Sequence, residues 1–337
     1  FQAEDGIRDV LLSLVGSEMC IRDSIRADLV SVEEEIGRML STRSDALRTL
    51  LEHVSRFSGK RLRPALTVLA GRMFGKVDVE HYRVGAIVEL IHTATLVHDD
   101  ILDESTMRRR VETINHKVGN ETAVLLGDYI FATCFKEAAL LEDRFASRYL
   151  SEIVAIVCRG EILQVHHRND FEMTEEVYFR IIEEKTAALY AAALRCGAHI
   201  AHASEEQGLA LASFGTKIGS AFQIIDDILD LTGEESAVGK SLGTDIEKAK
   251  MTLPLMRLRD AAGMEDASQL QQALTRGKAD ARRELVPILD KYGAIQSARE
   301  TAFQLVDEAR QLLAGLPDVP ERAYLAQVAD YVLSRDR

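Results

Sequence analysis

The feature that most constrains the fold is a long stretch without proline. Pro64 and Pro254 bound a segment that contains no other proline. Because proline removes a backbone donor and clashes with the preceding turn, its absence favours a succession of long α-helices. Within the segment, the apolar residues from Val84 to Ile91 follow the i, i+3, i+4, i+7 spacing of a helix, continuing to Ala94 and Thr95. Similar helical patterns run through Ala123–Leu141, Leu150–His166, Glu175–Ile200 and Gly208–Leu231.

The composition also indicates a helical, globular protein. Hydrophobic residues make up 47% of the chain and charged residues 28%, whereas aromatic residues reach only 6% and Trp is absent. A β-sandwich of this length would need more aromatic and β-branched residues and more turn breakers. No β-alternation persists over several strands, so we predict an all-α fold, a large helical bundle around a central cavity.

The charge balance excludes several classes of protein. The 54 acidic residues outnumber the 41 basic ones and give a formal net charge of −13, which argues against a nucleic-acid binder. No stretch approaches 18 consecutive apolar residues, so we expect no transmembrane segment. The cysteines have no metal-type spacing, and we expect reduced, buried thiols in a cytoplasmic protein. They are Cys20, Cys134, Cys158 and Cys196.

The first 24 residues differ from the rest of the chain. They lack an initiator Met, and acidic residues flank their short apolar stretch, which argues against a signal peptide. The segment resembles translated sequencing-adapter read-through; the alternative is an ordinary helical arm with VLLSLV as its apolar stripe. We therefore expect residues 1–24 to be non-native and residues 25–337 to form a single all-α domain.

Two identical acidic clusters carry the strongest functional signal. Residues 99–103 and 226–230 both read DDILD, and each follows an apolar helical run. On a helix the first and last Asp of each cluster share a face, where their like charges cost stability unless cations neutralise them. Carboxylates with room for water suit Mg²⁺, which bridges carboxylates to substrate phosphates. One such cluster is commonly a solvated helix end, but two copies favour a metal site.

Two basic runs supply the opposite charge. Residues 59–64 read GKRLRP, in which the proline suits the first turn of a helix, and Arg108, Arg109 and Arg110 follow the first acidic cluster. A helix N-terminus with Lys and Arg can bind a diphosphate. Either run alone is commonly a solvated face, but beside acidic metal sites both indicate anion clamps.

These motifs together resemble the trans-isoprenyl diphosphate synthases, the polyprenyl synthetase family, and its octaprenyl-type long-chain members. Besides the runs above, the matching segments are LIHTATLVHDDILDES at 90–105, LLGDY at 125–129, GEILQ at 160–164, KT at 185–186, FQIIDDILD at 222–230 and GKSLGTDIEKAKMTLP at 239–254. The resemblance implies an all-α isoprenoid synthase fold and a homodimer. It also implies Mg²⁺-dependent, repeated head-to-tail condensation of isopentenyl diphosphate with an allylic diphosphate such as farnesyl diphosphate. The long all-trans product would serve as a quinone side chain.

The resemblance also implies roles for individual residues. Isopentenyl diphosphate would be bound by Lys60, Arg63, His92 and Arg109. Mg²⁺ would be held by Asp99, Asp103, Asp226 and Asp230. The allylic diphosphate would be gripped by Arg108, Lys185 and Lys240, with Lys250 near it. Thr186 and Gln223 would face the developing cation. The family usually has Gly where this chain has Ser58, Arg110 and Ala249, and the role of Arg110 is therefore open.

Product length is predicted from the residues that precede the first cluster. Ala94 and Thr95 lie about one turn, roughly 6–7.5 Å along a helix, before Asp99. Short-chain members of the family are similar in having a bulky aromatic residue at these positions, which stops elongation early. By this resemblance, the small side chains of Ala94 and Thr95 predict a long product. The alternative interpretation is that these small residues only allow close helix packing.

Other kinds of protein share part of these motifs. A short-chain farnesyl or geranylgeranyl diphosphate synthase shares the motifs, and a class I terpene cyclase shares an aspartate-rich metal site. A non-catalytic regulatory subunit would keep the fold but lose the acidic clusters, which are intact here. For His98, beside the first cluster, we favour a packed helix histidine over a ligand, and the pair His166 and His167 lacks metal spacing.

Overall fold

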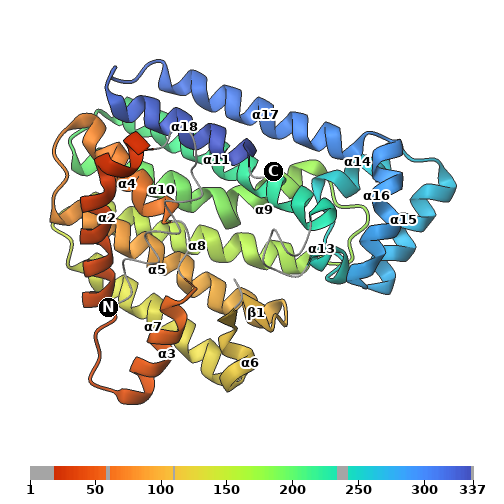
Figure 1. The fold of residues 1–337 in the computed structure, drawn as a ribbon, viewed down its shortest axis with the longest axis horizontal. Helices are drawn as coiled ribbons and strands as arrows, with labels where there is room; N and C mark the ends of the chain where they lie inside the picture. The colour runs from red at the N-terminus through yellow and green to blue at the C-terminus, as the bar shows by residue number, and fades with distance from the viewer. Residues whose placement is uncertain (1–18, 58–60, 109–110, 234–241, 335–337) are drawn as a thin grey trace. The chain divides into compact units, whose positions relative to one another are not determined.

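Long α-helices dominate the part of the chain that the structure describes. This computed structural model describes residues 19–57, 61–108, 111–233 and 242–334 (Figure 1). Within these ranges the only strands are β1 (Met107–Arg108) and β2 (Val111–Glu112), which form an antiparallel pair. The predicted all-α class is confirmed. Residues 1–18 of the N-terminal segment lie outside the described residues.

The helices follow one another with short connections. In chain order they are α2 (Met19–Met39), α3 (Asp45–Ser55), α4 (Leu62–Phe74), α5 (Val79–Leu102), α6 (Ile114–Val118), α7 (Asn120–Ala139), α8 (Arg144–His166), α9 (Glu175–Ile182), α10 (Ala188–Ile200), α11 (Glu205–Thr232), α13 (Thr244–Glu247), α14 (Leu253–Ala261), α15 (Met264–Arg276), α16 (Arg282–Lys291), α17 (Ala294–Leu313) and α18 (Pro320–Ser334). A 3₁₀ turn covers Ala279–Ala281. The helix predicted over Glu175–Ile200 is interrupted by a π-helical turn, Glu183–Ala187, which separates α9 from α10.

Residue contacts divide the chain into two compact units. The first comprises the described residues up to Val154, together with Leu189–Ala212 and Gly315–Gln327. The second comprises Ala155–Ala188, Ser213–Ala314 and the described residues from Val328 onward. The expectation of a single domain over residues 25–337 stays a prediction.

Helix α5 is the centre of the first unit. Its N-terminus is capped by Asp78, whose carboxylate accepts hydrogen bonds from the backbone N–H groups of Glu80 and His81. The helix packs against α2, α4 and α7 (Figure 1). Ile87 and Ile91 are fully buried, and burying a side chain of this size stabilises the fold by about 1.5–3 kcal/mol. Because its middle is packed on several sides, α5 holds its C-terminal end, residues 99–103, in a defined position.

A glycine of α7 leaves room for the ring of His98, which projects from α5. A Cβ atom on Gly127 would lie only 2.1 Å from Nε2 of His98. The same ring nitrogen lies 3.1 Å from the carbonyl oxygen of Val124. The prediction that His98 is a packed helix histidine is confirmed, and its ring fills the space that the missing side chain leaves.

The second unit has its own apolar core. Helix α14 packs against α15, α16 and α17, and its residues Leu253, Leu255 and Leu258 are fully buried. Arg282, at the start of α16, donates from Nη1 to the carbonyl oxygens of Leu231 and Gly233, each at 3.1 Å. A cation at the C-terminal end of a helix is favourable, so this contact fixes the end of α11.

The cysteines differ from one another in burial. Cys134 and Cys196 are buried free thiols, and burial raises the pKa of Cys134 to about 12. Cys158 is exposed, so the prediction of buried thiols is wrong for this residue, which lies on an outward face of α8. The side chain of Cys20 lies outside the described residues. No described helix combines the length and the apolarity that crossing a membrane requires.

Candidate active site

The first acidic cluster lies at the C-terminal end of α5. Asp99 and Asp103 are half-buried, and the backbone N–H of Asp103 donates to the carbonyl oxygen of Asp99 at 2.8 Å, so the two residues are one turn apart. The helix dipole is negative at this end and adds to the repulsion between the carboxylates. A cation bound here would relieve both effects.

Asp100, in the middle of the same cluster, has a different environment. It is 1% exposed and accepts from Arg108, with Nε at 2.9 Å from Oδ1 and Nη2 at 2.7 Å from the same oxygen. Burial raises the pKa of Asp100 above its ordinary value, although Arg108 opposes this shift. Arg108 was expected to bind a diphosphate. In this structure two of its nitrogens instead bind the buried carboxylate of Asp100.

The segment that follows the cluster is anchored by side chains of the next helix. Nδ2 of Asn115 donates to the carbonyl oxygens of Asp100 and Ser105, both at 3.1 Å. The hydroxyl of Thr113 donates to the carbonyl oxygen of Ser105 at 2.6 Å. These bonds hold the segment that carries Arg108 against the end of α5.

The basic run at the start of α4 divides between two roles. Arg61 is an ion-pair partner of Glu33 and of Glu89, the latter at 2.9 Å, and so ties α4 to α2 and α5. The guanidinium of Arg63 lies 4.6 Å from the ring centroid of Tyr190, a cation–π contact. Of the two arginines in this run, Arg61 binds carboxylates within the protein, whereas Arg63 contacts an aromatic ring.

The residues of α5 that precede the first cluster differ in exposure. His92 is half-buried and lies two turns before Asp99, on the same side of the helix. Thr95 is also half-buried, and its hydroxyl donates to the carbonyl oxygen of His92 at 2.7 Å. Ala94 is 0% exposed and packs fully within the unit. Of the two residues predicted to control product length, only Thr95 has accessible surface.

The first two aspartates of the second acidic cluster differ in burial as they do in the first cluster, but the third aspartate is buried only in the second. Asp226, on α11, is half-buried, whereas Asp227 and Asp230 are buried. The carboxylate of Asp230 accepts from the hydroxyl of Thr244 and from the backbone N–H of Asp245, both at 3.0 Å. Asp230 thereby caps the N-terminus of α13. Of the two predicted metal ligands in this cluster, Asp226 is therefore more accessible than Asp230.

A chain of hydrogen bonds joins three elements around Asp227. The hydroxyl of Tyr178, on α9, donates to Oδ2 of Asp227 at 2.7 Å. Nε2 of Gln223 donates to Oδ1 of Asp227 at 2.8 Å, and the hydroxyl of Thr186 donates to Oε1 of Gln223 at 3.0 Å. Burial raises the pKa of Asp227 well above its ordinary value. The structure thus brings together Thr186 and Gln223, which were predicted to face the developing cation.

Lys185 is held in the π-helical turn by residues of α8. Its Nζ donates to Oε1 of Gln164 at 2.6 Å and forms an ion pair with Glu161. A Cβ on Gly160 would lie 2.4 Å from the backbone nitrogen of Lys185, so only glycine allows the two elements to approach this closely. π-Helical turns occur frequently at functional sites, and this one carries both Lys185 and Thr186.

The segment after α13 carries Lys250. Its Nζ lies 3.5 Å from Oδ1 of Asp245, which is itself bound to Asp230 through its backbone N–H. Ala249 has φ +48°, a left-handed conformation that favours glycine, the residue usual at this position in the family. The remaining predicted positions, Ser58, Lys60, Arg109, Arg110 and Lys240, lie outside the described residues.

The accessible carboxylates suit a metal that is shared with a substrate. Among the described residues, no three Asp, Glu, His or Cys side chains gather as a closed metal site. In the first unit the half-buried Asp99 and Asp103 offer hard oxygen donors at the end of α5, and in the second unit the half-buried Asp226 offers one within α11. Mg²⁺ is usually bound by one or two carboxylates plus substrate phosphates and water, and these residues fit that pattern.

Several residues of the site were not assigned roles from the sequence. Tyr178, Glu161 and Gln164 contact predicted residues but received no role, although the last two belong to the GEILQ motif. The burial of Asp100 and Asp227 could have been anticipated, because each residue along a helix turns by about 100° and neighbouring aspartates therefore face different surroundings. The contact of Tyr178 has no local signal.

Known proteins resemble this chain over most of its length. A family model described as polyprenyl synthetase matches residues 44–289. The chain is 35% identical to the octaprenyl diphosphate synthase of Escherichia coli strain K12 over 320 residues, which cover 94% of this chain and 98% of the relative. It is 33% identical to a short chain isoprenyl diphosphate synthase of Methanothermobacter thermautotrophicus, covering 94% and 99%. The solved structure of a polyprenyl synthase from Caulobacter crescentus CB15, complexed with calcium and isoprenyl diphosphate, matches with a TM-score of 0.90 and 32% identity, covering 94% of this chain and 97% of that one.

Proposed function

Since the chain belongs to the polyprenyl synthetase family, we propose that it condenses isopentenyl diphosphate with an allylic diphosphate, repeatedly, to a long-chain all-trans polyprenyl diphosphate. The observation that carries the proposal is the repeated arrangement of the acidic clusters. In each cluster the first aspartate is half-buried and the second is buried and bound by protein donors. A cation bound at either cluster would reduce the repulsion among its carboxylates, which supports a role in holding a ligand.

The half-buried aspartates would hold Mg²⁺. Asp99, Asp103 and Asp226 are the more accessible candidates, whereas the carboxylate of Asp230 also accepts from the backbone N–H of Asp245 at the start of α13. When bound, Mg²⁺ neutralises charge on the diphosphate and makes it a better leaving group. Replacement of any one of these aspartates is expected to lower elongation on the order of 100-fold while leaving the fold intact.

The cationic side chains would bind the two diphosphates. We assign the allylic diphosphate to Arg108, Lys185, Lys240 and Lys250, and isopentenyl diphosphate to Lys60, Arg63, His92 and Arg109. As the allylic C1–O bond breaks, its electron pair leaves with pyrophosphate, and fixed cations stabilise that charge. The terminal alkene carbon of isopentenyl diphosphate then bonds to C1, and the proton lost from the product passes to pyrophosphate. No protein base is required.

Thr186 and Gln223 would stabilise the allylic cation. Their oxygens lie 3.0 Å apart, and both groups are neutral. A neutral oxygen can stabilise a carbocation by its dipole without capturing it as a carboxylate would. This accounts for an amide and a hydroxyl, rather than a further acid, beside the second cluster.

We propose that the product is long because the surface of α5 before the first cluster carries a small side chain. Thr95 is accessible there, so the growing chain can pass along it. Thr95→Phe is expected to shorten the product, measured by mass spectrometry of the extracted diphosphates. Ala94→Phe is expected to act mainly through misfolding, because Ala94 is packed. Unchanged product length in folded Thr95→Phe would contradict this gate.

A short-chain product is the second candidate, since a short chain isoprenyl diphosphate synthase has similar identity to the chain. The deciding experiment incubates purified protein with farnesyl diphosphate, radiolabelled isopentenyl diphosphate and Mg²⁺, and sizes the products. Long diphosphates support the proposal, and a stop at about one added unit supports the second candidate. A hydrocarbon product would indicate a terpene cyclase, and no elongation would overturn the proposal.

We further propose a homodimer that forms through the outer face of α7. This face carries Val124, Leu125 and Phe135, which are 42%, 62% and 44% exposed and recur at helical spacing with Ala132. Such a stripe favours burial against another protein surface. The variant L125E/F135E is expected to be monomeric by light scattering, whereas Met264→Glu, at an exposed position of α15, should remain dimeric. A wild-type monomer would contradict this.

A further inference from the structure

Tyr178 is buried beside the second acidic cluster. Its ring is 3% exposed, and its hydroxyl donates to Oδ2 of Asp227 at 2.7 Å. The other carboxylate oxygen of Asp227 accepts from the amide nitrogen of Gln223, one turn earlier on α11, at 2.8 Å. Both oxygens of Asp227 are therefore bound by neutral donors.

This arrangement determines which way the amide of Gln223 points. The carboxylate of Asp227 accepts here and attracts the NH₂ group of the amide, so the carbonyl oxygen is left to accept from the hydroxyl of Thr186. The two ends of an amide have almost the same shape, and only hydrogen bonding distinguishes them. If Asp227 turned away, the amide could rotate and present its NH₂ group in place of the oxygen. The positive end of that dipole would destabilise a neighbouring carbocation.

We propose that Tyr178 is a positioning residue that acts through Asp227 to keep the oxygen of Gln223 beside Thr186 and facing the reacting carbon. The inference rests on the proposed prenyl transfer and adds a residue to its machinery. Tyr178 reaches Gln223 only through the carboxylate between them. Its effect should therefore fall on the step in which the cation develops and not on the binding of the diphosphates.

The fold does not depend on this hydroxyl to hold α9. Arg257 binds Glu175, at the start of the helix, with Nη2 at 2.8 Å from Oε2. Arg259 donates from Nη1 to the carbonyl oxygens of Phe171 and Met173 at 2.7 and 2.8 Å. Helix α9 thus has independent anchors on α14, so removing one oxygen atom from Tyr178 should leave it in place.

The test is Tyr178→Phe, measured by steady-state kinetics with farnesyl diphosphate, isopentenyl diphosphate and Mg²⁺. We expect kcat to fall roughly tenfold while KM for both substrates stays unchanged, because the lost interaction operates only in the transition state. The matched control is Tyr82→Phe, which removes a similar bond, 2.8 Å from the hydroxyl to Oδ1 of Asp28, elsewhere in the chain. The control should keep the wild-type kcat, and thermal unfolding should show that both variants fold.

A double-mutant cycle separates positioning from a structural role. In a Gln223→Ala background, Tyr178→Phe should lower kcat no further, since the residue it positions is gone. Asp227→Ala, which cuts the link from the other side, should show the same dependence on Gln223. An equal fall in both backgrounds, an unchanged kcat, or a raised KM at constant kcat would overturn the inference. A wild-type protein that elongates nothing would instead contradict the proposed function.

Discussion

Neighbouring aspartates in each acidic cluster differ in environment. Asp99 and Asp226 are half-buried, whereas Asp100 binds Arg108 and Asp227 binds Tyr178 and Gln223 inside the protein. One step along a helix turns the side chain by about 100°, so adjacent residues point to different surroundings. The first aspartate of each cluster is therefore available as a metal ligand, whereas the second is bound by other side chains of the protein.

Asp226 repels the carboxylates that neighbour it on α11. We expect Asp226→Asn to raise the free energy of unfolding without metal by about 0.5 kcal/mol, because it removes one of three like charges on the same helix. Elongation should fall on the order of 100-fold. Urea unfolding and initial rates measure the two effects. The control, Asp45→Asn at the start of α3, should lower stability slightly, since a negative charge is favourable there. Destabilisation by Asp226→Asn would contradict the argument.

Ala249 occupies a backbone conformation that suits glycine. Its φ of +48° brings Cβ close to the backbone, so Ala249→Gly should raise the free energy of unfolding by about 0.5–1 kcal/mol despite the greater freedom of unfolded glycine. Ala27→Gly, at an exposed position within α2, should lower it by a similar amount. Urea unfolding of both variants gives the comparison, and a loss of stability in Ala249→Gly would refute the strain.

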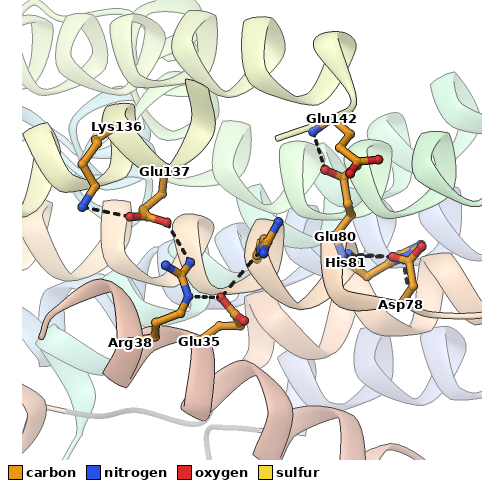
Figure 2. Close-up of polar contacts among 9 residues, drawn as sticks. Glu35, Arg38, Asp78, Glu80, His81, Lys136, Glu137 and Glu142 are labelled. Carbon is orange, nitrogen blue, oxygen red and sulfur yellow. Dashed lines mark hydrogen bonds and ion pairs between the residues drawn. The ribbon is translucent and has the colours of Figure 1, made fainter. Parts of the chain in front are cut away.

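Helices of the first unit are joined by polar contacts beyond their apolar faces. Figure 2 shows Glu137 of α7 bound by Arg38 of α2 at 2.7 Å and by its neighbour Lys136 at 3.0 Å. Arg38 also donates to Glu35 at 2.8 Å. In the same view Glu80, in the first turn of α5, accepts from the backbone N–H of Glu142, just after α7. These contacts set how far one helix is displaced along another, which apolar packing alone specifies weakly.

The ion pair between α2 and α7 should make stability depend on pH. Burial opposes ionisation of Glu137, but hydrogen bonds from Arg38 and Lys136 prevail and lower its pKa. A lowered folded-state pKa contributes stability above the unfolded value of about 4.3, and that contribution is lost as the pH falls through the folded value. Glu137→Gln should therefore cost about 1 kcal/mol at pH 7 and much less near pH 3.5.

Urea unfolding at the two pH values measures this difference. Glu284→Gln, in the exposed pair with Arg276, is the control and should have little effect at either pH, since exposed pairs contribute little. An effect of Glu137→Gln that is equal at both pH values would show that lost packing, and not charge, accounts for it.

The net charge of −13 of the whole chain includes the six aspartates of the two acidic clusters, whose charge bound Mg²⁺ would partly neutralise. A ligand that binds only the folded state at 100 times its Kd stabilises that state by about 2.7 kcal/mol. Mg²⁺ with inorganic pyrophosphate should therefore raise Tm by several degrees, and EDTA should reverse the rise. NaCl at equal ionic strength and the variant Asp99→Asn should show little increase. An equal rise with NaCl would indicate general screening.

Much of the fold followed from local patterns. The apolar spacing from Val84 to Ile91 and the missing prolines predicted α5 and its neighbours, because helix periodicity and backbone donors are properties of short segments. The π-helical turn Glu183–Ala187 was not predicted, because the helical spacing of the apolar residues continues through it, and its close approach to Gly160 of α8 is a tertiary contact. Exposure of Cys158 and burial of Ala94 also depend on which face of a helix other elements cover.

The sequence by itself determined the helices, the family and the residue types of the site, because motifs and periodicity are read along the chain. Only the tertiary structure decided how those residues are employed. It pairs Arg108 with Asp100, uses Asp230 to cap α13, and brings Tyr178 to Asp227 across 49 positions of sequence. The physical reason is that a buried polar group must find a partner, and distant segments supply that partner only after the chain has packed.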